Sequence, residues 1–163
     1  MSIKTNIKIE VICMLLKDRL IRGFIAGVIA SIFANIPGYI LYSLGTTSMR
    51  FVDWAALFIY GTHAQNFLEM IVAQVGQIIF SGILGIIFAY LIPYITSIGN
   101  LFKGWLYGVG SWFFIYAFTI LFDLEQTYPI RFGTAFSNFI GASIYGLILA
   151  AVLKWLDNKV SIK

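Results

Sequence analysis

The sequence is poor in charged residues, in cysteine and in histidine, and each shortage excludes a class of protein. Only 11% of the 163 residues are charged, against about 25% in a typical soluble domain, so water is not the main solvent of this chain. The single cysteine, Cys13, excludes an intramolecular disulfide, and the single histidine, His63, excludes a zinc site built from several histidines. The short signatures of hydrolases, metalloproteases, kinases and phosphate-binding loops are also missing. We therefore expect no enzyme, no metal site and no cofactor.

Long apolar runs take up most of the chain instead. Apolar residues make up 60% of the sequence, and four runs are long enough to cross about 30 Å of hydrocarbon as helices that rise about 1.5 Å per residue. These runs cover residues 22–44, 67–94, 101–122 and 134–156. The sequence therefore predicts an all-α integral membrane protein, with residues 1–163 forming one domain around four transmembrane helices.

The few basic residues indicate how the spans are oriented. Nine of the eleven lie before the first span, between the second and third, or after the fourth, and the other two are Arg50 and Arg131. Because cytoplasmic segments are enriched in Lys and Arg, both termini are expected in the cytoplasm. The net charge of +4 is thereby assigned to topology and to contact with membrane lipids, and not to nucleic acid.

Two segments outside the spans are expected to lie against the membrane. Residues 1–21 carry apolar side chains at helical spacing beside lysines, which predicts an amphipathic inner-surface arm or a simple extension of the first span. Residues 51–60 are mostly apolar but too short to span, so they predict an interfacial or re-entrant helix in the first outer connection. Asp53 suits the N-cap of that helix and Gly61 suits its end.

Two of the spans open with nearly the same residues. The first begins Arg22-Gly-Phe-Ile-Ala-Gly-Val28 and the third begins Lys103-Gly-Trp-Leu-Tyr-Gly-Val109. The second and fourth spans align more loosely, with Ser81 matched to Gly146. The pattern is typical of two helical hairpins in parallel repeat, or of residues that are common at any inner membrane edge.

Small residues recur about every fourth position in all four spans. Helices in lipid associate by close backbone approach and not by a hydrophobic drive, so such residues indicate helix contacts. They predict a compact four-helix bundle, some faces of which would serve a second copy of the chain or another membrane protein. The expected packing positions are Gly23, Gly27, Ser31, Gly85, Gly104, Gly108, Gly141 and Gly146.

Polar side chains form one stripe along the second span. Glu69, Gln77 and Ser81 are separated by multiples of four residues and share a helix face, and Asn35 of the first span can face them at about mid-depth. Polar groups in hydrocarbon indicate a path for a solute or a proton, which His63 could join. The plainer interpretation is that the stripe holds helices together and that Glu69 reaches water at the surface.

The order of these features is itself informative. A basic residue and glycines open the first span, Gly38-Tyr39-Ile-Leu-Tyr42 follows, a tryptophan stands in the outer loop, and Lys103-Gly-Trp-Leu-Tyr-Gly108 opens the third span. This order resembles the small four-span membrane proteins of Gram-positive bacteria typified by YqhR. The resemblance implies a bacterial plasma membrane and carries over no activity and no functional residue.

Two functions remain in view from the sequence. The first is a non-enzymatic bundle that serves as a scaffold or accessory subunit through packing. The alternative is a small permease or proton-linked transport subunit that uses Glu69, Gln77 and Asn35.

Overall fold

The computed structural model describes residues 17–95, 98–122 and 130–161, and their regular structure is entirely helical. The helices are α2 (Arg19–Ser43), α3 (Phe51–Tyr60), α4 (Phe67–Leu91), η1 (Ile92–Tyr94), α5 (Asn100–Leu121) and α6 (Phe132–Ser161). Four helical segments are long and apolar enough to cross a membrane, namely α2, α4 with η1, α5 and α6. The predicted all-α bundle with four candidate spans is confirmed. The predicted arm, residues 1–21, lies largely outside the described residues.

Side-chain caps explain where two of the helices begin. The Asp18 carboxylate accepts a hydrogen bond from the Leu20 backbone N–H at 2.9 Å at the start of α2. In α3 the N-cap position belongs to Arg50, and Asp53 stands three residues later, where it accepts the Arg50 backbone N–H at 2.7 Å. The prediction that Asp53 is the N-cap is therefore wrong, because its carboxylate caps the helix from within the first turn. Gly61 ends α3 with a φ of 71°, as predicted.

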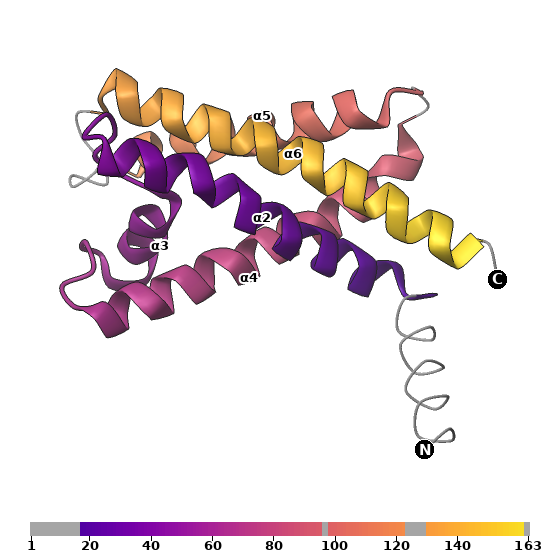
Figure 1. The fold of residues 1–163 in the computed structure, drawn as a ribbon, viewed down its shortest axis with the longest axis horizontal. Coiled ribbons are helices and arrows are strands. Elements are labelled where there is room, and N and C mark those ends of the chain that lie inside the picture. Colours follow the sequence, from indigo (N-terminus) through magenta and orange to yellow (C-terminus); the bar gives the residue numbers. More distant parts are fainter. Residues whose placement is uncertain (1–16, 96–97, 123–129, 162–163) are drawn as a thin grey trace, which may run out of the picture.

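The four spans pack as a row in the order α4, α2, α6, α5. The second helix packs along both α4 and α6, and α6 packs along both α2 and α5, whereas α4 and α5 barely touch. Figure 1 shows α2 crossing α4, and α4 separating from α2 toward the end where α3 lies. Because α3 packs against α4 at this end, it partly fills the opening. The bundle is thus closed on three sides and open on the fourth.

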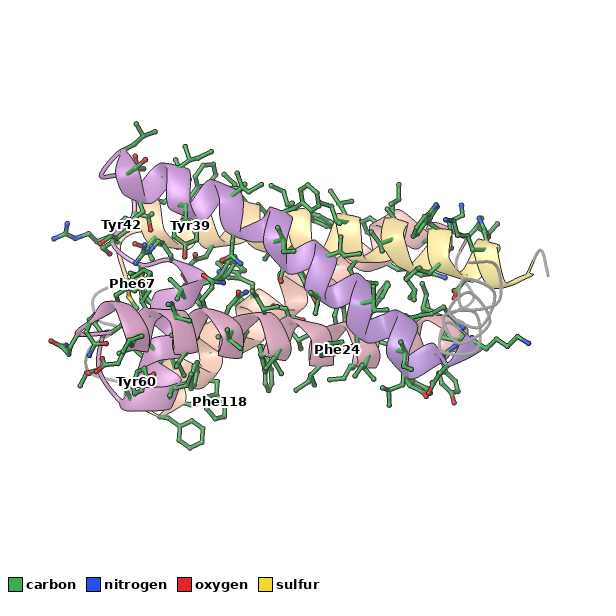
Figure 2. All side chains as sticks on the ribbon, turned by 60° about the horizontal axis from the view of Figure 1, so that its bottom comes forward. Phe24, Tyr39, Tyr42, Tyr60, Phe67 and Phe118 are labelled. Atoms are coloured by element: carbon green, nitrogen blue, oxygen red, sulfur yellow. The ribbon has the colours of Figure 1, made fainter. Side chains whose placement is uncertain are left out.

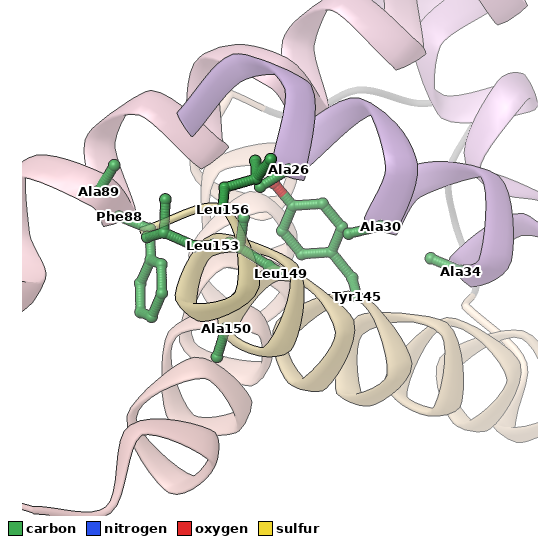
Figure 3. Close-up of a cluster of buried hydrophobic side chains, with 10 residues drawn as sticks. All are labelled: Ala26, Ala30, Ala34, Phe88, Ala89, Tyr145, Leu149, Ala150, Leu153 and Leu156. Atoms are coloured by element: carbon green, nitrogen blue, oxygen red, sulfur yellow. The ribbon is translucent and has the colours of Figure 1, made fainter. Parts of the chain in front are cut away.

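The centre of the row is a contact between small residues on α2 and large residues on α6 (Figure 3). Ala26, Ala30 and Ala34 of α2 are at most 2% exposed, and they pack in one cluster with Tyr145, Leu149, Leu153 and Leu156 of α6. Large apolar side chains such as Phe67 cover the outside of the molecule (Figure 2). A protein in water would bury such a surface, and a bilayer solvates it.

Glycines set the distance between α2 and α4. A Cβ atom at Gly23 would lie 2.8 Å from the Gly85 carbonyl oxygen, and one at Gly27 would overlap the Ser81 carbonyl oxygen. The two backbones are in contact here, so no side chain fits between them. Three of the packing positions expected from the sequence therefore meet in one interface.

The contact between α5 and α6 repeats this arrangement. A Cβ atom at Gly104 would overlap the Gly146 carbonyl oxygen, and one at Gly108 would overlap the Ala142 carbonyl oxygen. Gly23 opposite Gly85 thus corresponds to Gly104 opposite Gly146. The pair of α2 and α4 and the pair of α5 and α6 are two hairpins built on the same backbone contacts.

A side-chain contact follows the same correspondence. The Phe24 ring of α2 lies against Gly82 of α4. At the matching place in the second hairpin, the Trp105 indole N–H donates to the Ser143 hydroxyl at 3.1 Å. An aromatic residue in one helix therefore faces the same site of its partner in both hairpins.

The register of the repeat differs by one helical turn from the sequence alignment. The contacts match Ser81 to Ala142, whereas the alignment matched Ser81 to Gly146. The alignment followed the similar aromatic and leucine residues at the inner ends of the second and fourth spans. The actual register depends on where glycine backbones meet the partner helix, which residue similarity alone does not reveal.

Candidate functional site

Part of the predicted polar stripe is a hydrogen-bonded chain between α2 and α4. Asn35 Nδ2 donates to Gln77 Oε1 at 3.0 Å and to the Ser31 carbonyl oxygen at 2.8 Å. Gln77 Nε2 donates to Ser81 Oγ at 3.2 Å, and Ser81 Oγ donates to the Gln77 carbonyl oxygen at 2.9 Å. The structure thus brings Asn35, Gln77 and Ser81 together, and these groups bond mainly to one another.

The chain continues to the lipid-facing surface through a residue that the stripe did not include. Gln74 Nε2 donates to Gln77 Oε1 at 2.9 Å, and the exposed Tyr39 hydroxyl donates to Gln74 Oε1 at 2.7 Å. Gln74 lies three residues before Gln77, so the two long side chains are neighbours on the helix surface. Helical spacing in fours selected a single face and therefore passed over this residue.

Glu69 has a different role from the other residues of the stripe. Its carboxylate accepts the Gln65 backbone N–H at 2.7 Å and the Asn66 side-chain amide at 2.7 Å, while Asn66 Oδ1 accepts the Glu69 backbone N–H at 2.9 Å. This reciprocal arrangement caps the start of α4, where the helix dipole favours a negative charge. Glu69 is separated from Gln77 by two turns and takes part in the cap instead of the chain.

His63 lies in the connection before α4. It is exposed, and its backbone carbonyl accepts a hydrogen bond from Gln65 Nε2 at 2.8 Å. Within the described residues, no group of three or more His, Cys, Asp and Glu side chains is arranged to hold a metal ion.

An arginine fastens α3 to the end of α2. Arg50 Nε and one terminal nitrogen donate to the two carboxylate oxygens of Asp53, at 3.0 and 2.9 Å, and its guanidinium lies 4.2 Å from the centre of the Tyr42 ring. The hydrogen bonds to Asp53 raise the pKa of Arg50, so the cation and its forked contact persist at any physiological pH. This cluster fixes the place at which α3 enters the open side of the bundle.

The open side holds a groove of about 510 Å³ between α4 and α5. The floor is formed by α2 and α6, and α3 covers one end. The lining is mostly aromatic and aliphatic, and it includes the side chains of Trp54, Phe58, Phe80, Leu84, Phe114 and Asn138. Because α4 and α5 barely touch, the groove opens sideways to the surroundings of the bundle.

A pair of tyrosines ties α4 to the second hairpin at the far end of the groove. The Tyr107 hydroxyl donates to the Leu84 carbonyl oxygen at 2.7 Å, and its ring lies 5.1 Å from that of Phe88. The Tyr145 hydroxyl donates to the Ser81 carbonyl oxygen at 2.6 Å. The groove is therefore confined between α3 and Tyr107 and does not run the full length of the bundle.

A polar cluster lies within the groove, next to α3. Asn138 Nδ2 donates to the Tyr116 hydroxyl at 2.8 Å, and the Trp54 ring lies 5.0 Å from the Tyr116 ring. Trp54 and Asn138 are 5% and 1% exposed, and neither Trp54 Nε1 nor Asn138 Oδ1 has a hydrogen-bond partner among the described residues. Unpaired buried polar atoms are uncommon and costly, so this pair distinguishes the groove from ordinary packing.

The sequence interpretation did not identify this cluster, although one signal was present. Asn138 is the only Asn or Gln within residues 134–156, and a lone amide in a membrane span is a candidate site residue. Its partners come from α3 and α5, which only the folded bundle brings together.

No protein-family model, no curated protein and no solved structure matches the chain. Its function is therefore argued from the geometry of the site.

Proposed function

We propose that the protein is a non-enzymatic membrane protein that serves as a scaffold or accessory subunit and binds other membrane components within the plane of the bilayer. The observation that carries this proposal is the contrast between the chain and the groove. Asn35, Gln77 and Ser81 are engaged with one another, whereas the groove between α4 and α5 opens sideways and retains unpaired polar atoms. Interhelical amide contacts of the first kind typically hold membrane helices together.

Membrane lipids are the partners that such a surface meets first. A second copy of the chain and another membrane protein are the further partners that the small-residue faces would suit. The lipid-facing rim of the groove is aromatic, and Phe80 and Phe114 are 47% and 70% exposed there. This rim supports contact with acyl chains before contact with a close-packed helix.

We further propose a bacterial plasma membrane and cytoplasmic termini. Support comes from the basic side chains: Arg22 at the start of α2 pairs with Asp157 near the end of α6 at 2.7 Å, so these helix ends share one side of the bundle. Lys154 and Lys159 lie close by in sequence. An excess of Lys and Arg on one side is the usual sign of the cytoplasmic face.

Thiol labelling tests this orientation. In a Cys13→Ser background, Thr62→Cys should react with an impermeant thiol reagent in intact cells, and Asn158→Cys should react only after the membrane is permeabilised. Both replaced side chains are exposed, so access is decided by the membrane. Labelling of Asn158→Cys in intact cells would refute the proposed orientation.

Flux measurements separate the accessory function from the transport alternative. Purified wild type and Glu69→Gln should both leave proton and solute flux in reconstituted vesicles at the level of empty vesicles, because Glu69 serves to cap α4. Amide and carboxylate match in shape, but only the carboxylate exchanges protons. Reproducible wild-type flux that disappears in Glu69→Gln, at unchanged stability, would establish transport instead.

A further inference from the structure

We infer that the groove between α4 and α5 binds a single-chain amphiphile that carries a hydroxyl group, with the hydroxyl placed between Trp54 and Asn138 and the chain lying along the aromatic walls. This inference rests on the proposed function and names the class of membrane component that the groove receives.

The unpaired polar atoms specify the head of the ligand. Trp54 Nε1 is a donor only, and the Asn138 amide uses one end on Tyr116 and leaves the other end free. A hydroxyl accepts one hydrogen bond and donates another, so it can bond to the indole N–H and to the free end of the amide at once. It does so whichever way the amide is turned, because it can serve either end. Trp54 and Tyr116 are in ring contact, so both sites face the same part of the groove.

The rest of the groove specifies the tail. Its volume of about 510 Å³ lies within the roughly 300–1,000 Å³ that is typical of sites for small organic ligands. The walls next to the polar cluster are apolar, and Phe80, Phe114 and Phe118 at the rim are 47%, 70% and 40% exposed. A chain can therefore enter sideways from the surrounding lipid without crossing the covered ends.

A transmembrane helix does not fit the same groove. Where helices of this protein approach one another closely, glycine meets backbone, as at Gly27 and Gly108. The groove has aromatic walls, is covered by α3 at one end and is closed by Tyr107 at the other. A partner helix would need small facing residues and a groove that extends over the whole hydrocarbon thickness of about 30 Å. A single flexible chain needs neither.

Intrinsic fluorescence can report occupancy of the groove. The chain has four tryptophans, and two of them, Trp54 and Trp112, line the groove. In a Trp105→Phe/Trp155→Phe background these two are the only reporters, and Phe is acceptable at position 105 because Phe24 occupies the matching place in the first hairpin. A long-chain monoacylglycerol with a brominated chain, added to phosphatidylcholine vesicles that hold this protein, should quench the fluorescence in a saturable manner.

A matched pair of substitutions locates the binding. Ser111 lines the groove, whereas Leu106 is 56% exposed and is not part of the lining, and both residues belong to α5. Ser111→Phe should fill the groove and remove the saturable quenching, and Leu106→Phe should leave it unchanged. Saturable quenching that persists in folded Ser111→Phe would overturn the inference.

A second comparison tests the hydroxyl. A brominated alkane of the same chain length should bind about fivefold more weakly than the monoacylglycerol, as expected for the loss of one net hydrogen bond. Trp54→Phe keeps a ring at that position but removes the N–H, and Trp112 still reports, so this variant should bind the two ligands with more similar affinity. Equal binding of both ligands by the parent protein would overturn the inference. Flux through the vesicles would refute the proposed accessory function without affecting this result, and the absence of saturable quenching would refute the ligand without creating flux.

Discussion

The two hairpins share their glycine contacts but use the polar pair beside those contacts in opposite ways. In the first hairpin Asn35 on α2 bonds to Gln77 on α4, and Gln77 bonds onward to Ser81. At the matching position of the second hairpin Tyr116 on α5 bonds to Asn138 on α6, whose other polar atom is unpaired and buried beside the groove. One backbone framework therefore supports a closed polar contact in one half and an open one in the other.

The repeat is broken where α4 and α5 would otherwise meet. If the second hairpin packed on the first by the same rule on both sides, α2 and α5 would be equally buried. In fact 39% of the apolar window of α2 is buried, against 17% for α5. The ten residues of α3 enter this side and pack against α4. Their insertion converts a place for helix packing into a groove.

The strongest test of the comparison is to break both glycine contacts. Gly27→Leu and Gly108→Leu should each lower the free energy of unfolding by at least about 3 kcal/mol, because each new side chain would overlap a backbone carbonyl of the partner helix. The loss should appear as a lower melting temperature in detergent, followed by size-exclusion chromatography. Gly110→Leu is the matched control, since a Cβ atom there meets nothing within 4 Å. A variant of either hairpin that melts with the wild type would contradict the shared contact.

An intermediate effect is expected from the two polar pairs. Gln77→Leu removes the acceptor of both Asn35 and Gln74, and it should cost about 1 to 2 kcal/mol. Asn138→Leu removes one bond to Tyr116 but also removes a buried unpaired oxygen, so its cost should stay below about 1 kcal/mol. Urea or thermal unfolding in the same detergent measures both. A larger loss for Asn138→Leu would show that the second pair also holds helices together.

The smallest effect should come from the link at the inner end of the groove. Tyr107→Phe removes the hydrogen bond to the Leu84 carbonyl oxygen and keeps the ring beside Phe88. The expected loss is about 0.6 kcal/mol, the average for hydrogen bonds between membrane helices. Thermal unfolding beside wild type gives the value, and a loss above about 2 kcal/mol would mean that this hydroxyl is a main support of α4.

The spans and the packing glycines were open to sequence reasoning because both depend on local patterns of length and spacing. The cap at Glu69 was equally local, since Asn66 stands three residues before it in the pattern of a capping box. The groove was not open to such reasoning. It depends on the position of α3 between helices that are distant in sequence, and on the register of α4 relative to α6, which residue similarity displaced by one turn.

The packing order of the spans also determines when the bundle can close during synthesis. Each hairpin joins neighbouring spans, so α2 and α4 can associate before the rest of the chain is made. The alanine face of α2, with Ala26 and Ala30, has its partner on α6, the last helix in the sequence. Until α6 is inserted, this face meets lipid, and α5 lacks the helix against which its glycines pack. The final span therefore acts as the keystone of assembly, and a chain cut before it would leave one formed hairpin and one unpaired helix in the membrane.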